Sequence, residues 1–70
     1  MDRQSVVSSN LNSVGYDEES QVLEIEFSNG SVYEYSGVPA SVYEELMSAS
    51  SHGSYHYNNI RNTYNYNRIG

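Results

Sequence analysis

The amino-acid sequence predicts a small α+β domain, in which an antiparallel β-meander of three or four strands packs against one main helix, with a short second helix and a strand-like C-terminal segment. Two observations carry this prediction. Residues 23–35 hold two alternating apolar and polar runs on either side of a turn signal, which is typical of a β-hairpin. Residues 42–49 instead place apolar side chains at helical spacing. A sheet and a helix each leave an apolar surface uncovered, so the two must form packed layers.

The composition limits what can stabilise such a fold. The chain has 70 residues with no cysteine and no tryptophan, and eight tyrosines supply much of its apolar surface. Neither a disulfide nor a thiolate-bound metal can brace it. We expect a flexible N-terminus over residues 1–5 and a single domain over residues 6–69. No segment has the pattern of a membrane span or a signal peptide, so a cytoplasmic location is expected.

The strands before the hairpin are short. Residues 5–9 are compatible with an edge strand. Residues 10–16 are predicted to form a strand with Val14 and Tyr16 on one face and Leu11 on the other, because successive side chains of a strand alternate. The charged and polar run that follows favours a turn before the hairpin.

The register of the hairpin decides where its two tyrosine rings lie. A two-residue turn would place Glu34 opposite Ile25 and would turn both rings to the polar face. A three-residue loop over residues 28–30 would instead place Tyr33 opposite Ile25. We favour the second register, because the first would bury an unpaired carboxylate. Tyr33 and Tyr35 are therefore predicted to be mainly core residues.

The second half of the chain is predicted to be mostly helical. The main helix begins either directly after Pro39, which suits a first helical turn, or at Ser41 and Glu44, which have capping-box spacing. A short second helix is expected over residues 51–59, and residues 64–67 alternate like a final strand. The predicted core draws on the hairpin and on both helical segments, and it comprises Leu23, Ile25, Phe27, Tyr33, Tyr35, Val42, Leu46 and Ile60.

Several short motifs follow one another along almost the whole chain, namely Val7-Ser8-Ser9, Val14-Gly15-Tyr16-Asp17, a Leu-x-Ile-x-Phe-x-x-Gly-x-x-Tyr-x-Tyr run over residues 23–35, Val38-Pro39, Tyr43, Leu46, Ala49, Ser51-x-Gly53-x-Tyr55, Asn58, Ile60-Arg61 and Tyr64-x-Tyr66. This order resembles the KTSC domain family, which occurs at the C-terminus of some lysyl-tRNA synthetases and in small stand-alone bacterial and phage proteins. The resemblance implies a compact α+β module with the Tyr-x-Tyr motif near its centre. It implies no established molecular function, although RNA binding has been proposed for the family.

Candidate binding residues lie in the C-terminal part of the chain. The formal net charge of −6 disfavours non-specific binding to nucleic acid. Arg61, however, lies among tyrosines, a composition typical of proteins that stack single-stranded bases. In the structural interpretation its guanidinium pairs with Glu24, Glu26 or Glu45 and stacks on a tyrosine to close the core. This interpretation is favoured because three cations can neutralise very few phosphates. The candidate set for contacts with RNA or another partner is Arg61, Arg68, Tyr55, Tyr57, Tyr64 and Tyr66.

Catalytic and metal-binding signals are weak. His52 and His56 are four residues apart and would share a helix face, but no third ligand lies nearby, so we predict no metal and no cofactor. Ser51 and Gly53 are compatible either with an anion-binding turn or with a simple helix cap. No nucleophile, base and oxyanion donor follow a recognisable order, so an enzyme is not expected.

Two functions remain. The first is a non-catalytic binding module whose ligand, by the resemblance, is RNA or tRNA. The second is a protein-interaction module, bacterial or phage-encoded, that docks a partner through a tyrosine-rich surface or a free sheet edge. Arginines that converge on one tyrosine-lined face would favour RNA, whereas arginines tied to glutamates would favour a protein partner.

Overall fold

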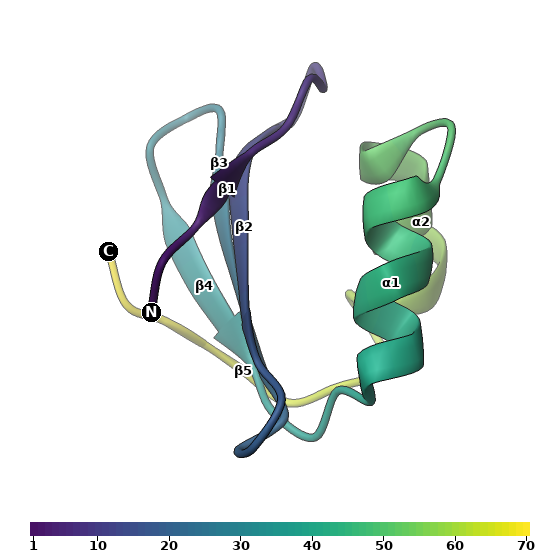
Figure 1. Cartoon of the computed structure of the whole chain (residues 1–70). Helices are drawn as coiled ribbons and strands as arrows, with labels where there is room; N and C mark the ends of the chain where they lie inside the picture. Colours follow the sequence, from purple (N-terminus) through teal and green to yellow (C-terminus); the bar gives the residue numbers. More distant parts are fainter.

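The computed structural model describes residues 1–70 as a two-layer α+β fold (Figure 1). One layer is an antiparallel sheet of five strands whose spatial order follows the chain, and both helices cover the same face of it. No helix has the length and apolar character needed to cross a membrane. The elements are β1 (Gln4–Ser5), β2 (Leu11–Asp17), β3 (Val22–Phe27), β4 (Val32–Tyr35), α1 (Ala40–Ser48), α2 (His52–Asn59) and β5 (Tyr66–Arg68).

The hairpin of β3 and β4 has the register that the sequence favours. Ile25 lies opposite Tyr33 and Leu23 lies opposite Tyr35. The loop holds three residues, and Gly30 has a φ of 91°, a left-handed conformation that other residues rarely adopt. Tyr35 is 3% exposed, so its ring belongs to the core as predicted.

A β-bulge corrects the predicted orientation of Leu11. The pairing of β2 with β3 shifts between Leu11, which lies opposite Phe27, and Ser13, which lies opposite Glu26. The extra residue, Asn12, reverses the alternation of side chains along the strand. Leu11 and Val14, predicted to face opposite sides, are therefore both buried in the same core.

The first strand of the sheet lies nearer the N-terminus than residues 5–9. β1 occupies Gln4–Ser5, so two of the residues expected to be flexible pair with β2. Arg3 continues across the outer face of the sheet, where it forms an ion pair with Glu24. Gly15 permits this close approach, because an added Cβ would lie 2.8 Å from the backbone oxygen of Asp2.

The buried core differs from the predicted core in two ways: some predicted residues are only half-buried, and some buried residues were not predicted. Of the eight predicted core residues, Leu23, Ile25, Tyr35, Leu46 and Ile60 are buried, whereas Phe27, Tyr33 and Val42 are half-buried and pack against them. The core also includes three residues absent from the prediction: Leu11, Val14 and Val38. Val38 lies in the connection between sheet and helix, where no periodic pattern marks it.

The helix boundaries follow local chemistry. Pro39 precedes the first residue of α1 and no side chain caps that end, so the Ser41–Glu44 capping box does not form. Ser51 caps α2 instead, and its hydroxyl oxygen accepts a hydrogen bond from the backbone N–H of Ser54. The final strand, expected over residues 64–67, is found at Tyr66–Arg68.

Tyr16 joins the sheet to the start of α1. Its hydroxyl donates a hydrogen bond of 2.6 Å to the carbonyl oxygen of Val38, and its ring stacks on Tyr43 of α1 with centroids 4.8 Å apart. The carbonyl belongs to a buried residue of an irregular segment, where a missing partner is costly. One side chain thus satisfies the backbone at the crossover from sheet to helix.

We therefore expect Tyr16→Phe to lower the free energy of unfolding by about 1–2 kcal/mol, because the Val38 carbonyl loses its partner while the stacked ring remains. Urea denaturation measures this loss. Tyr57→Phe is the matched control, since Tyr57 is 61% exposed and should change stability by less than about 0.5 kcal/mol. Equal effects of the two substitutions would contradict the role assigned to the Tyr16 hydroxyl.

Candidate ligand-binding site

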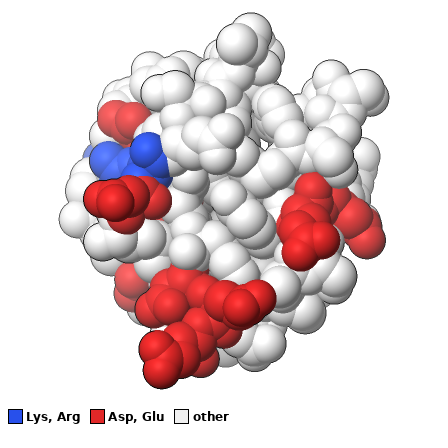
Figure 2. All heavy atoms as spheres, in the orientation of Figure 1, with Lys and Arg blue, Asp and Glu red and all other residues white.

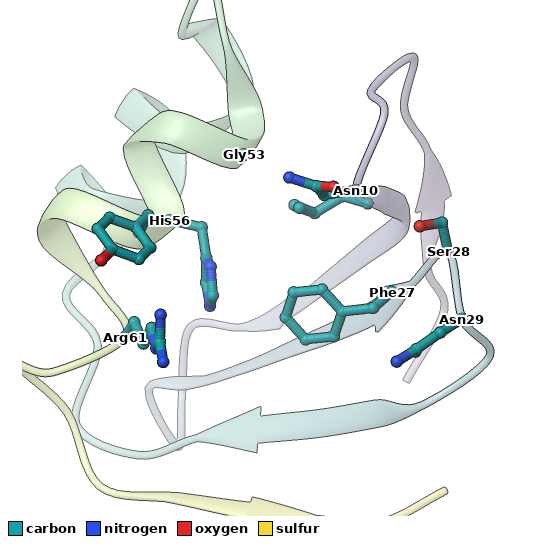
Figure 3. A pocket seen from close by; sticks show the side chains of 9 residues that line it. Asn10, Phe27, Ser28, Asn29, Gly53, His56 and Arg61 are labelled. Carbon is teal, nitrogen blue, oxygen red and sulfur yellow. The ribbon is translucent and has the colours of Figure 1, made fainter.

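A hollow opens between α2 and the loop that joins β3 to β4 (Figure 3). It consists of two cavities of about 340 and 320 Å³ that share four lining residues, Phe27, Asn29, His56 and Arg61. We call it the α2 hollow. None of the residues that line either cavity is acidic, although the chain carries nine carboxylate side chains.

The acidic side chains lie elsewhere. Figure 2 shows acidic atoms at several places on one face of the molecule, whereas basic atoms form one small patch that touches acidic ones. The only ion pair of the protein joins Arg3 to Glu24, on the outer face of the sheet. The α2 hollow is therefore a region free of acidic side chains in an otherwise acidic protein.

His56 is fixed at the centre of the hollow. It is 8% exposed, its Nε2 lies 2.8 Å from the hydroxyl of Tyr35, and its ring packs edge-on against Phe27 with centroids 5.1 Å apart. Burial, with a smaller effect from the nearby charge of Arg61, lowers the pKa of His56 to about 4. The imidazole is therefore neutral at neutral pH.

The hydrogen bond to Tyr35 also determines the tautomer of His56. Burial raises the pKa of Tyr35 to about 12, so its hydroxyl keeps its proton, and His56 is the only hydrogen-bond partner of that hydroxyl. The hydroxyl thus donates to Nε2, and the imidazole hydrogen is assigned to Nδ1. Nδ1 has no partner in the protein, and no fully buried polar side-chain atom lacks one. Nδ1–H is therefore not fully buried, and it belongs to a side chain that lines both cavities of the hollow.

Arg61 provides the positive charge of the hollow. Its Cζ lies 5.1 Å from the ring centroid of Tyr57, and its backbone N–H donates to the carbonyl oxygen of His56 at the end of α2. No carboxylate pairs with it, so the glutamate pair of the structural interpretation is not found, whereas the stacking on a tyrosine that the same interpretation expects is present. Its guanidinium stays available to a ligand.

The structure brings together only part of the predicted binding set. Tyr57 and Tyr66 line the hollow with Arg61. Arg68 lies opposite Tyr33 in the sheet, hence on the same face, and its Nε donates to the carbonyl oxygen of Gly70.

The two other tyrosines of the predicted set serve packing. The hydroxyl of Tyr55 donates to a carboxylate oxygen of Glu45 at 2.9 Å, which ties α2 to α1. Burial, with this hydrogen bond as a further cause, raises the pKa of Tyr55 to about 12. Tyr64 is half-buried against the core.

The lining residues outside the predicted binding set include Asn10, Asn29 and His56. The sequence marks Asn29 as a turn residue and His56 as a histidine near a helix end. The available signal was the separation of His56 from Arg61, which puts His56 in the last turn of α2 and Arg61 just beyond its end. Asn29 comes near His56 and Arg61 only because α2 packs on the hairpin, which the sequence pattern does not reveal.

The two histidines do not converge on a metal site. Nδ1–H of His52 donates to the carbonyl oxygen of Leu46 at 2.8 Å, which satisfies an acceptor near the end of α1. His56 instead contacts Tyr35, and no group of three metal-ligating side chains exists in the structure. Ser51 acts as a helix cap, and Gly53 lets α2 approach Asn10, whose Nδ2 would lie 3.1 Å from an added Cβ.

We expect the stability of the fold to fall as the pH drops from about 6.5 to about 4, because the unfolded chain binds a proton at His56 in this range and the folded chain does not. The loss attributable to His56 amounts to as much as about 3 kcal/mol. Urea denaturation at several pH values measures it. His56→Gln should flatten the pH dependence and His52→Gln should keep it, so equal curves for these two variants would contradict this explanation.

Comparison with known proteins agrees with this architecture. The model of the KTSC domain family matches residues 7–64. A crystal structure of a KTSC domain protein from Yersinia pestis superposes with a TM-score of 0.93 at 38% identity, covering 99% of this chain and 97% of that one.

Relatives at the sequence level are of two kinds. An uncharacterised protein of Stutzerimonas stutzeri is 47% identical over 60 residues, which span 86% of this chain and 83% of the relative. A lysine–tRNA ligase of Trichormus variabilis is 43% identical over 54 residues, but the match spans only 10% of that protein. Family model, solved structure and stand-alone relative all lead to the same conclusion: this chain belongs to the KTSC domain family.

Proposed function

We propose that this KTSC domain protein is a non-catalytic, cytoplasmic binding module that binds single-stranded RNA at the α2 hollow. The observation that carries the proposal is the pairing state of the arginines. Arg3 is tied to a glutamate, whereas neither Arg61 nor Arg68 pairs with an aspartate or glutamate side chain. Arg61 lines the hollow with Tyr57 and Tyr66, and Arg68 lies opposite Tyr33 on the same face of the sheet, where its Nε donates to an oxygen of Gly70. Free guanidinium groups beside aromatic rings are the combination that binds unpaired bases and their phosphates.

The relatives add independent support for RNA. A segment of lysine–tRNA ligases matches this chain, and the names of those proteins specify tRNA as what they act on. The matched segment is a small part of each ligase, so the ligase reaction itself is not carried over. A module attached to a protein that acts on tRNA would have RNA within reach.

The net charge limits the strength and type of binding. Arg61 and Arg68 together neutralise at most two phosphates, so the logarithm of the affinity should fall with the logarithm of salt concentration with a slope no steeper than about −1.4. Stacking on aromatic rings, at about 1–3 kcal/mol per base, must then supply much of the affinity. Recognition of a few unpaired bases fits this balance better than recognition of a duplex backbone.

The absence of a catalytic pair supports a non-catalytic role. Both serine hydroxyls that line the hollow donate to oxygen atoms of the protein, Ser28 to the carbonyl of Ser9 and Ser31 to the side chain of Asn29. Neither serine bonds to His56, whose Nε2 is occupied by Tyr35. The hollow therefore lacks the nucleophile and base contact that covalent catalysis requires.

A second candidate is a protein partner that adds a strand to β5. This strand pairs with β4 on one side only and forms an edge of the sheet. Two apolar side chains at this edge are exposed: Tyr66, the first residue of β5, at 56%, and Ile69, the residue after its end, at 50%. An extended peptide could use this edge through backbone hydrogen bonds and contact both side chains.

We expect Arg61→Ala to weaken binding of a short single-stranded RNA about tenfold, which corresponds to about 1.4 kcal/mol, because it removes a phosphate contact and a stacking surface. Fluorescence anisotropy at low and moderate salt measures the change. Arg3→Ala removes the same charge on the opposite face of the sheet and should leave the affinity within twofold. Equal affinities of wild type and Arg61→Ala would exclude Arg61 as a contact.

A further inference from the structure

Three side chains of the α2 hollow offer hydrogen-bond donors that have no acceptor in the protein. Nδ1–H of His56 and the guanidinium of Arg61 are two donors without a protein acceptor. Asn29 supplies a third, because its Oδ1 accepts from the backbone N–H and the hydroxyl of Ser31 at 3.0 and 2.7 Å. These two bonds fix the amide so that its NH₂ group remains free.

The donors surround an aromatic side chain. Figure 3 shows the ring of Phe27 between Asn29 on one side and His56 with Arg61 on the other. Phe27 lines both cavities and is held by edge-on contacts with His56 and with Tyr33. The hollow therefore combines a fixed apolar wall with donors on either side and no acidic side chain.

We propose that the α2 hollow is the pocket for a single unpaired nucleotide of the bound RNA. The guanidinium of Arg61 and Nδ1–H of His56 donate to the phosphate, Phe27 packs against the base, and the NH₂ group of Asn29 donates to an acceptor on the base edge. This inference rests on the proposed function, which supplies RNA as the source of the nucleotide.

The dimensions and the donors favour one nucleotide over other ligands. Each cavity is near 300 Å³, the lower limit for a small-molecule site, so the hollow suits one base with its phosphate rather than a longer segment. An anion satisfies the donors without a carboxylate to repel it. A peptide carboxylate would also satisfy them but has no flat ring for Phe27.

Tyr35 is a positioning residue in this arrangement. It contacts the nucleotide only through His56, because its hydroxyl donates to Nε2 and so keeps the hydrogen on Nδ1. Tyr35→Phe removes this constraint and leaves the ring in the core. The structure thus assigns to Tyr35 an effect on the tautomer of His56 as well as on packing.

The first experiment is an NMR titration of the ¹⁵N-labelled protein with four probes: a 5′-mononucleotide, the corresponding nucleoside, inorganic phosphate and a short peptide with a free C-terminal carboxylate. We expect the mononucleotide to shift the backbone amide signals of Asn29, His56 and Arg61 at millimolar concentration. The other three probes should bind at least tenfold more weakly. A single-stranded hexanucleotide RNA should shift the same signals and compete with the mononucleotide.

The outcomes separate the two proposals. Binding of RNA without binding of the mononucleotide would overturn the single-nucleotide pocket and leave the proposed function intact. Binding of the mononucleotide without RNA would support the pocket and overturn RNA as the source of the ligand. Tighter binding of the peptide would overturn the pocket in favour of a protein partner, and silence with every probe would overturn both proposals.

Two variants test the individual donors. Asn29→Asp keeps an oxygen for Ser31 but places a negative charge in the hollow, so mononucleotide and RNA should each bind at least tenfold more weakly. Asn67→Asp makes the same charge change at a position opposite Glu34, on the outer face of the sheet, and should leave binding within twofold. Equal losses in these two variants would overturn the assignment of Asn29.

The ¹⁵N chemical shifts of the imidazole of His56 test the role of Tyr35. The wild-type protein should have hydrogen on Nδ1 and none on Nε2, and Tyr35→Phe should move part of the population to the other tautomer with a parallel loss of mononucleotide affinity. Tyr43→Phe is the matched control and should keep the wild-type shifts, because Tyr43 stacks on Tyr16 and lines neither cavity. Hydrogen on Nε2 in the wild-type protein would overturn the donor assigned to His56.

Discussion

The hydrogen bond between Tyr35 and His56 is the contact on which both layers of the structure depend. It joins the end of β4 to the last turn of α2, inside a core with few aliphatic side chains. The partners satisfy each other where water has little access, so neither polar tip is left unpaired. The same hydrogen bond fixes the ring of His56 in the wall of the hollow. It therefore contributes both to the stability of the fold and to the shape of the candidate binding surface.

A chain of this size that is poor in aliphatic residues must use tyrosines as core material. The rings supply apolar area, and the hydroxyls must then find acceptors. Three tyrosine hydroxyls each find an acceptor at a different junction. Tyr16 bonds to the segment before α1, Tyr35 bonds to α2, and Tyr55 of α2 bonds to α1. Tyrosine hydroxyls thus fix the relative positions of elements that a larger core would hold by shape alone.

The hairpin register could be predicted because one alternative buried an unpaired carboxylate at Glu34, a cost that local sequence reveals. The face of Leu11 could not, since the bulge at Asn12 leaves no marker in the pattern of apolar residues. Val38 escaped prediction for a related reason, because it lies in an irregular connection. Patterns of alternation thus specify regular strands and fail where one residue interrupts them.

The candidate site was predictable only in its C-terminal part. Arg61 and its neighbouring tyrosines stand out by composition, yet whether a given tyrosine is free depends on contacts such as that between Tyr55 and Glu45. Asn29 and His56 meet across 27 positions of sequence and reach the hollow through tertiary packing alone. The availability of a donor is a property of the folded chain, because it depends on which acceptors are already occupied.

The two chain ends leave the fold on the side of the sheet away from the helices, near each other (Figure 1). The α2 hollow lies on the helix-covered side. A polypeptide joined at either end would therefore start on the side of the sheet opposite the hollow. Relatives of this chain include both a short uncharacterised protein and a segment of a lysine–tRNA ligase, and this position of the chain ends is compatible with both settings.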